Sequence, residues 1–130
     1  MPATLLTLAA AFTLCTSAPR VTCVVDGDTF WLEGEKIRIA DINALEIAQA
    51  GCAREAALGQ RAKLRLASLL NKGRIELVAA GRERDRYGRL LRTVNREGHS
   101  LGAMLIAEGL AEPWRGRRSD WCADESKTAR

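Results

Sequence analysis

The 130-residue sequence predicts a small α+β domain that is mostly β, a five-stranded Greek-key barrel with two main helices. Three observations predict it. Five short segments are rich in apolar and β-branched residues, a segment with helical periodicity follows the third, and a second one follows the fifth. A generic α+β domain would give a similar order of elements, so that alternative stays open.

The first strands are expected within Val21–Leu32 and Lys36–Ile42, where apolar residues alternate with polar ones. Gly27 interrupts the first segment, and we expect the backbone there to bend or to pass close to another element. Residues 33–36 (Glu-Gly-Glu-Lys) have the composition of a hairpin turn, and residues 43–51 are expected to form a loop.

The clearest helix is predicted over Cys52–Leu70, because its alanine and leucine residues recur at helical spacing. The sequence Asn-Lys-Gly that follows is a good helix end. Arg74–Val78 alternates as a short strand, and Arg89–Val94 reads as the last strand. Between them, Gly81–Gly88 is expected to be a charged loop.

Ser100 is placed to cap a second helix over Leu101–Glu108. The polar segment that follows, Leu110–Arg130, is expected to be irregular, and its last residues to be frayed. The chain shows no internal repeat and no interdomain linker. We therefore assign residues 20–122 to one domain and residues 123–130 to a tail.

Residues 1–19 carry no charged side chain, and Leu5–Leu14 has the length and apolar character of a signal-peptide core. Residues 16–18 (Thr-Ser-Ala) make an acceptable cleavage site. These features predict export to the periplasm or the medium. An ordered N-terminal extension, as a strand or helix, is the alternative. The segment is short for a membrane span.

Four cysteines are present, at positions 15, 23, 52 and 122. If Cys15 leaves with a signal peptide, three remain, and we expect one disulfide among Cys23, Cys52 and Cys122. The sequence leaves the pairing open. A zinc site is disfavoured because the chain has no CxxC motif and His99 is its only histidine.

The formal net charge is +4 and the sequence pI is about 9.2, which points weakly to an anionic partner. The arginines gather in two groups: Arg82, Arg84, Arg86, Arg89, Arg92 and Arg96, then Arg115, Arg117 and Arg118. A solvated face is the ordinary explanation for such groups. Nearby carboxylates make a phosphate substrate credible, because phosphoryl transfer uses both kinds of group.

Hydrolysis of a phosphodiester needs a water that is deprotonated and aimed at phosphorus, and a carboxylate beside a bound cation can do this. Arginine suits the extra negative charge on the reacting phosphoryl group, because its planar fork donates two parallel hydrogen bonds and stays protonated. The chain offers carboxylates and arginines in this region but no histidine cluster and no serine or cysteine triad.

Three separated motifs carry a family resemblance. They are residues 26–29 (Asp-Gly-Asp-Thr), Arg38 with Glu46 eight positions later, and residues 85–89 (Asp-Arg-Tyr-Gly-Arg). With these in order, the chain resembles the staphylococcal nuclease (thermonuclease) family from about Val21 to Trp114. The resemblance implies an OB-fold and Ca²⁺-dependent hydrolysis of DNA or RNA with little sequence specificity, by a monomer without a stable membrane partner.

The resemblance also implies a role for each matching residue. Arg38 and Arg89 contact the scissile phosphate, and Glu46 is the general base. The metal ligands are Asp28 through its carboxylate, Thr29 through its backbone carbonyl, and Asn43; Arg86 and Tyr87 lie near the terminal phosphate of the substrate.

Two residues depart from the family pattern. Asn43 stands where a second aspartate ligand is usual, so weaker calcium binding is expected. Leu45 stands where proline is usual, so the loop that holds Glu46 is expected to be looser. Asp41 is a conjectural compensating carboxylate. The alternatives are a non-catalytic module that binds nucleic acid or another polyanion, and a purely structural network of ion pairs.

Overall fold

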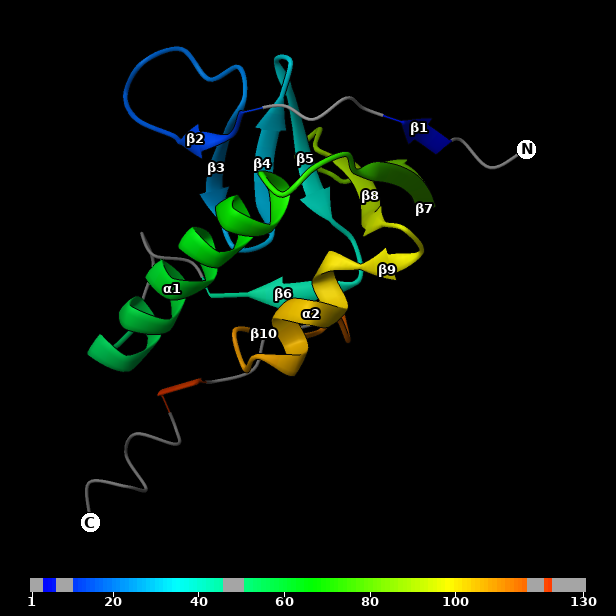
Figure 1. Ribbon diagram of the computed structural model, residues 1–130. Helices are drawn as coiled ribbons and strands as arrows, with labels where there is room; N and C mark the ends of the chain where they lie inside the picture. Colours follow the sequence, from blue (N-terminus) through cyan, green and yellow to red (C-terminus); the bar gives the residue numbers. More distant parts are fainter. Residues whose placement is uncertain (1–3, 7–10, 46–50, 117–120, 123–130) are drawn as a thin grey trace.

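The computed structural model describes residues 4–6, 11–45, 51–116 and 121–122. It is a mixed α+β fold in which a large sheet carries two helices, α1 (Ala53–Leu70) and α2 (Leu101–Ala107) (Figure 1). The predicted helices are both confirmed, the first to within one residue of its expected start. Ser100 caps α2 as expected, because its side chain accepts a hydrogen bond from the Ala103 N–H.

The main sheet has eight strands: β1 (Thr4–Leu6), β2 (Thr13–Leu14), β3 (Cys23–Asp26), β4 (Thr29–Leu32), β5 (Glu35–Ile39), β7 (Glu76–Arg84), β8 (Leu90–Arg96) and β9 (His99–Ser100). Their order is β1-β7-β8-β5-β4-β3-β2, and β9 pairs with β8. The β5–β8 and β2–β3 pairs are parallel, and the others are antiparallel.

The predicted closure into a five-stranded barrel is not confirmed. Over the described residues the sheet is open, with β1 and β2 as the end strands. Both end strands come from the N-terminal segment, which the sequence analysis set outside the domain. β1 pairs with β7 and β2 pairs with β3, so these two short strands occupy the edges of the five strands that were predicted to form the barrel.

A second, two-stranded sheet is formed by β6 (Ile42–Ala44) and β10 (Ala111–Pro113). The sequence analysis expected a loop at the first of these segments and an irregular chain at the second. The antiparallel register places Glu112 opposite Asn43. The sequence did not reveal this pairing, because three residues are too few to show an alternating pattern.

The predicted charged loop at residues 81–88 is shorter than expected. β7 continues through Arg84, which pairs with Leu90 of β8, after a register shift between Ala79 and Arg84. Most of this part of the strand is exposed, so no apolar alternation marked it in the sequence. A bulge of this kind twists a strand and redirects its side chains.

Helix α1 packs mainly against β3, and its residues Leu66, Leu69 and Leu70 join one apolar core (Figure 1). Gly27 explains how closely it packs: a Cβ at that position would lie 2.6 Å from the Ala62 Cβ and 2.9 Å from the Ala44 Cβ. The expected close approach at Gly27 is thus confirmed. The backbone just before Asp28 is wedged between α1 and β6.

The segment before residue 19 takes part in the packing where it is described. Phe12 is buried and meets Phe30 edge to face, with 5.7 Å between ring centroids. Its backbone N–H donates to the Asn71 side chain at 2.7 Å, and its carbonyl accepts from the same amide at 2.9 Å. These contacts tie the N-terminal segment to the end of α1.

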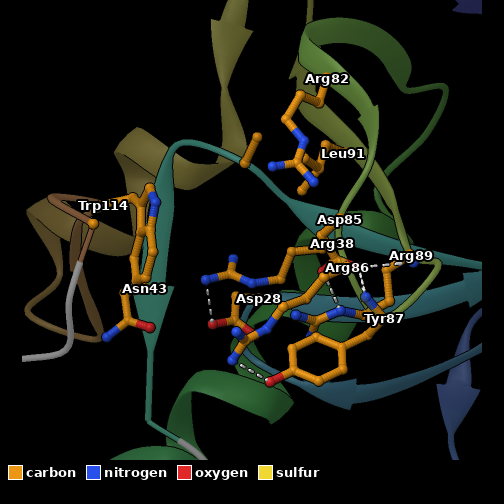
Figure 2. A pocket seen from close by; sticks show the side chains of 12 residues that line it. Asp28, Arg38, Asn43, Arg82, Asp85, Arg86, Tyr87, Arg89, Leu91 and Trp114 are labelled. Carbon is orange, nitrogen blue, oxygen red and sulfur yellow. Dashed lines mark hydrogen bonds and ion pairs between the residues drawn. The ribbon is translucent and has the colours of Figure 1, made fainter.

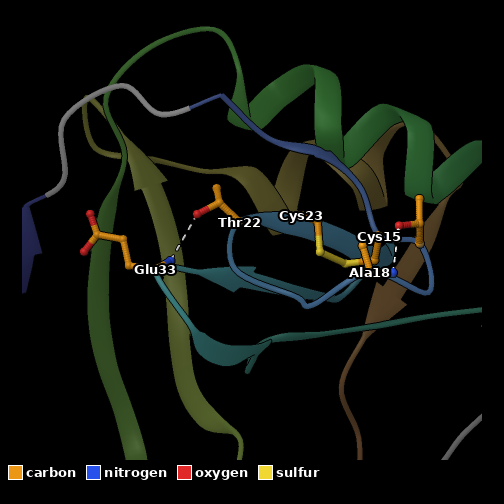
Figure 3. The surroundings of a disulfide bond; sticks show 6 residues. Cys15, Ala18, Thr22, Cys23 and Glu33 are labelled. Carbon is orange, nitrogen blue, oxygen red and sulfur yellow. Dashed lines mark hydrogen bonds between the residues drawn. A yellow bond between two sulfur atoms is a disulfide. The ribbon is translucent and has the colours of Figure 1, made fainter.

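Two disulfides are present, and they use all four cysteines. Cys15–Cys23 joins the segment before β3 to that strand (Figure 3), and Cys52–Cys122 joins the start of α1 to a residue 70 positions later. The expectation of a bond among Cys23, Cys52 and Cys122 holds for the second pair. The Cys15–Cys23 bond was not predicted, because Cys15 was expected to leave with the signal peptide. No helix in the described part of the chain is long and apolar enough to cross a membrane.

Candidate functional site

One cavity of about 610 Å³ gathers side chains from three distant segments (Figure 2). Its lining residues come from the β3–β6 region, the β7–β8 hairpin and the segment after β10: Asp28, Arg38, Ala40, Asn43, Arg82, Asp85, Arg86, Tyr87, Arg89, Leu91, Trp114 and Gly116. Six of the eight predicted site residues are among them. The parallel pairing of β5 with β8 brings the first two segments together, since Arg38 lies opposite Leu91.

Asp28 is a buried carboxylate at the floor of the cavity, with 5% of the residue exposed. Its Oδ1 accepts from the Thr29 hydroxyl at 2.9 Å, and its Oδ2 accepts from the Ala44 N–H at 2.9 Å. The second bond joins the β3–β4 turn to β6. These donors and the charge of Arg38 compensate the burial of this carboxylate and fix its orientation.

Arg38 extends from β5 across the cavity. Its Nη1 donates to the carbonyls of Ile39 and Ile42, the latter at 2.9 Å. Its Nη2 lies 3.5 Å from Asp28 Oδ2, and the guanidinium stands 5.6 Å from the ring centroid of Trp114. Arg38 is thus a fixed part of the wall, because four neighbouring groups hold its guanidinium in place: two backbone carbonyls, the Asp28 carboxylate and the Trp114 ring.

Arg89 is held by Asp85 in the β7–β8 hairpin. Its Nε donates to Asp85 Oδ2 at 2.6 Å, and Asp85 Oδ1 accepts from the backbone N–H groups of Tyr87 at 2.9 Å and Arg89 at 3.0 Å. Burial alone would raise the pKa of Asp85, but these hydrogen bonds and the charge of Arg89 outweigh it, so the pKa lies below its ordinary value. Asp85 therefore fixes the conformation of the loop that carries Arg89.

Arg86 and Tyr87 form the exposed tip of the same hairpin. The Arg86 guanidinium donates to the Tyr87 hydroxyl at 2.8 Å and lies 5.0 Å from its ring centroid. Arg89 approaches the same ring at 5.4 Å. Tyr87 is 68% exposed, so its ring stands in solvent at the cavity mouth, in contact with both cationic heads (Figure 2).

Asn43 faces these groups from β6 and is 4% exposed. Its Nδ2 donates to Glu112 Oε1 at 3.3 Å, and Figure 2 shows its Oδ1 on the side that faces Asp28. Thr29, the other predicted oxygen ligand, does not line the cavity; its hydroxyl supports Asp28 from behind.

Glu46, the predicted general base, lies outside the described residues. The residue before it, Leu45, is fully buried at 0% exposure, so apolar packing holds the chain up to that point although proline is absent. Asp41 does not act on the cavity as conjectured. Its carboxylate is directed at α2, where Oδ2 accepts from the Ser100 hydroxyl at 3.2 Å.

Sequence reasoning missed part of the cavity wall. Trp114 lies in none of the three motifs, and its place beside Arg38 depends on the unforeseen β6–β10 pairing. Arg82 was one arginine in a cluster of six, and nothing in the sequence distinguished it. It lies within the β7 register shift, which directs it into the cavity.

The charges lining the cavity suit an anion. Four arginines (Arg38, Arg82, Arg86 and Arg89) face two aspartates (Asp28 and Asp85), a formal excess of two positive charges. In the described ranges neither terminal nitrogen of Arg89 has a hydrogen-bond partner in the protein, and the guanidinium of Arg82 has none either. These groups can donate to phosphate oxygens without breaking an existing bond.

The cavity offers oxygen ligands for a metal ion, but few of them are negatively charged. The described residues contain no group of three or more histidine, cysteine, aspartate or glutamate residues arranged for a metal. Asp28 and the Asn43 carboxamide oxygen lie on the same side of the cavity. This donor set is hard and charge-poor, which fits a weakly held Ca²⁺ that keeps several waters better than a transition metal.

Comparison with known proteins supplies the family. A family model described as staphylococcal nuclease homologue matches residues 36–128, a range that includes Arg38, Asn43 and the β7–β8 hairpin. The search of curated proteins gave no match. Since the matched range spans more than half of the chain, the protein belongs to the staphylococcal nuclease homologue family.

Proposed function

We propose that this protein is a Ca²⁺-dependent nuclease that hydrolyses phosphodiester bonds of DNA or RNA with little sequence preference. Membership of the family supports a nuclease or nucleic-acid-binding role. The observation that carries the proposal is the convergence of Arg38 and Arg89. They come from segments some fifty residues apart and border one cavity with Asp28 and Asn43. Two guanidinium groups beside a carboxylate suit a phosphodiester group.

In this mechanism Arg38 and Arg89 bind the non-bridging oxygens of the scissile phosphate. Their charge is worth most when the phosphoryl group gains a fifth ligand and extra negative charge. Each guanidinium is fixed beforehand by a carboxylate, Arg38 by Asp28 and Arg89 by Asp85. The arginines therefore need little reorganisation when the transition state forms.

Calcium would be held by the Asp28 carboxylate, the Asn43 carboxamide oxygen and the Thr29 backbone carbonyl. When bound, the ion would neutralise phosphate charge and acidify a bound water. Glu46 is the proposed general base that takes the proton from the attacking water. Arg86 and Tyr87, at the mouth of the cavity, would bind an adjoining phosphate of the chain.

Low specificity follows from the kind of groups that line the cavity. Arginines recognise the charged backbone, which is the same in every sequence. The half-exposed ring of Trp114 offers a face on which any base can stack. The protein would act as a monomer, and export to the periplasm or the medium is supported by the two disulfides, which persist in oxidising compartments.

The direct test is cleavage of end-labelled single-stranded DNA with calcium, compared with the same reaction in excess chelator. We expect cleavage only with calcium. Glu46→Gln should lower the rate at least about a hundredfold if Glu46 is the base. Cleavage that survives the chelator would contradict the metal role.

A second candidate is a module that binds nucleic acid or another polyanion without cutting it. One observation favours it: the position of the second metal ligand is the neutral Asn43, and Nη2 of Arg38 already neutralises Asp28 at 3.5 Å. DNA binding that is retained in chelator, together with no cleavage at any calcium concentration, would favour this candidate over the nuclease.

A further inference from the structure

Glu112 belongs to none of the three motifs, but it contacts Asn43, a residue of the candidate metal site. It lies on β10 directly opposite Asn43 of β6, and its Oε1 is 3.3 Å from Asn43 Nδ2. Residues opposite each other in an antiparallel pair have adjacent side chains on one face of the sheet. Glu112 does not itself line the cavity, whereas Asn43 does.

The contact decides which end of the Asn43 carboxamide faces the cavity. An ionised carboxylate can only accept hydrogen bonds, so it selects the amide nitrogen as its neighbour and turns the amide oxygen the other way. Figure 2 shows that oxygen on the side of Asp28. Since Asn43 is only 4% exposed, little water competes for the nitrogen.

The same contact places negative charge behind a neutral ligand. A carboxylate that accepts from the amide N–H polarises the amide and makes its oxygen a better donor to a cation. Asn43 supplies the ligand oxygen and Glu112 supplies the negative charge. An aspartate at position 43 would supply both from one side chain.

We propose that Glu112 is a positioning residue that holds the carboxamide oxygen of Asn43 toward Asp28 as a ligand for a divalent cation, Ca²⁺ in the first instance. The inference rests on the proposed function for the identity of the ion. It goes further in assigning to Glu112, which lies in none of the three motifs, control over whether Asn43 can act as a ligand.

The test is a double-mutant cycle on calcium affinity, measured by calorimetry with calcium alone and no nucleic acid. Glu112→Gln in the native Asn43 background should weaken calcium binding about tenfold. In the Asn43→Asp background the same change should leave calcium affinity unchanged, because both oxygens of an aspartate are acceptors and either can face the ion. An equal loss in both backgrounds would overturn the proposal, since it would mean that Glu112 acts only through stability or net charge.

Two further measurements separate positioning from folding. Glu108→Gln removes the same charge from an exposed ion pair with Arg65 on α1 and should leave calcium affinity unchanged. The side-chain amide signals of Asn43 in an ¹⁵N-labelled, metal-free protein should shift in Glu112→Gln and stay in place in Glu108→Gln. Unmoved Asn43 signals would contradict the contact itself.

The outcomes also distinguish this inference from the nuclease proposal. If Glu112→Gln weakens calcium binding only in the native Asn43 background and DNA is not cleaved, the positioning role is supported and the nuclease proposal is wrong. If native protein binds no calcium at all, the ligand role assigned to Asn43 and Glu112 is wrong.

Discussion

The Nε of Arg89 donates to Asp85 at 2.6 Å, and its two terminal nitrogens have no hydrogen-bond partner in the protein within the described ranges. One edge of the guanidinium is therefore used for positioning and the other remains available for a ligand. Asp85 is fixed in turn by the backbone N–H groups of Tyr87 and Arg89. The hairpin thus orients its own arginine within a segment of five residues, 85–89.

The first prediction concerns this carboxylate. Asp85→Asn should destabilise the fold by about 1–3 kcal/mol, because it weakens three hydrogen bonds to a carboxylate that is 17% exposed. It should also reduce nucleic-acid affinity, because Arg89 loses its fixed orientation. Urea unfolding and a fluorescence-anisotropy titration with labelled DNA measure the two effects. Unchanged affinity would show that the Asp85–Arg89 pair has no part in binding.

The pH dependence of stability provides a second prediction. The pKa of Asp85 is lowered from 3.8, so the unfolded chain binds its proton at a higher pH than the native protein. Its stabilisation is complete above pH 3.8 and is lost as the pH falls toward the lowered value. The same sign holds for Glu35, whose pKa is lowered by its hydrogen bond to Arg84.

Stability should therefore fall as the pH is lowered through the range below about 4. Thermal unfolding between pH 6 and pH 2 measures the slope. The slope should be smaller in Asp85→Asn, and a slope identical to that of the native protein would contradict the assignment.

A third prediction compares two arginines of one cavity. Arg38→Met should destabilise the protein by about 2–4 kcal/mol, because it leaves the buried Asp28 charge and two carbonyls without their guanidinium. Arg82→Met should change stability by less than about 0.5 kcal/mol, since Arg82 has no protein partner in the part of the chain that the structure describes. Both variants should bind DNA less tightly, which anisotropy measures. Equal stability of the two would mean that Arg38 is not structural.

A fourth prediction concerns Gly27. Gly27→Ala should cost about 1–3 kcal/mol or more, because the new Cβ would meet Ala62 at 2.6 Å and Ala44 at 2.9 Å. The backbone shift would also displace Asp28. Gly51→Ala is a matched control, since among the described residues its Cβ would meet Cys122 Sγ alone, at the ordinary contact distance of 3.5 Å. Denaturant midpoints of the two variants test the difference, and similar midpoints would refute the close approach.

The fifth prediction ranks the disulfides. Replacing both Cys52 and Cys122 with alanine removes a cross-link over 70 residues and should cost about 4 kcal/mol, against about 2–3 kcal/mol for Cys15 and Cys23, which lie 8 residues apart. Unfolding in urea measures both. A larger loss for the short bond would indicate that the Cys15–Cys23 bond acts by holding the N-terminal segment against β3.

Much of the site could be predicted from short motifs, because each motif forms one local structure that places its side chains in a fixed way. Asp28 lies beside Gly27 in the β3–β4 turn, and the motif residues 86, 87 and 89 lie in the turn of the β7–β8 hairpin. Their placement within each turn is therefore encoded by a few adjacent residues. The structure brings them into one cavity with Arg38 and Asn43.

What the sequence did not reveal depends on long-range pairing. The β6–β10 pair, which places Glu112 against Asn43 and Trp114 near Arg38, joins two three-residue strands almost seventy residues apart. The edge strands β1 and β2 come from a segment whose apolar composition is equally typical of a leader. In both cases the pattern was too short or too ambiguous to identify its partner.

Because the lining residues Trp114 and Gly116 directly follow β10, the cavity wall is complete only after β10 has paired with β6. During synthesis on the ribosome, residues 28–43 and 82–91 emerge well before Trp114 and Glu112, so a nascent chain would carry the arginines without the finished cavity. Full ligand affinity should therefore arise only after β10 has docked on β6.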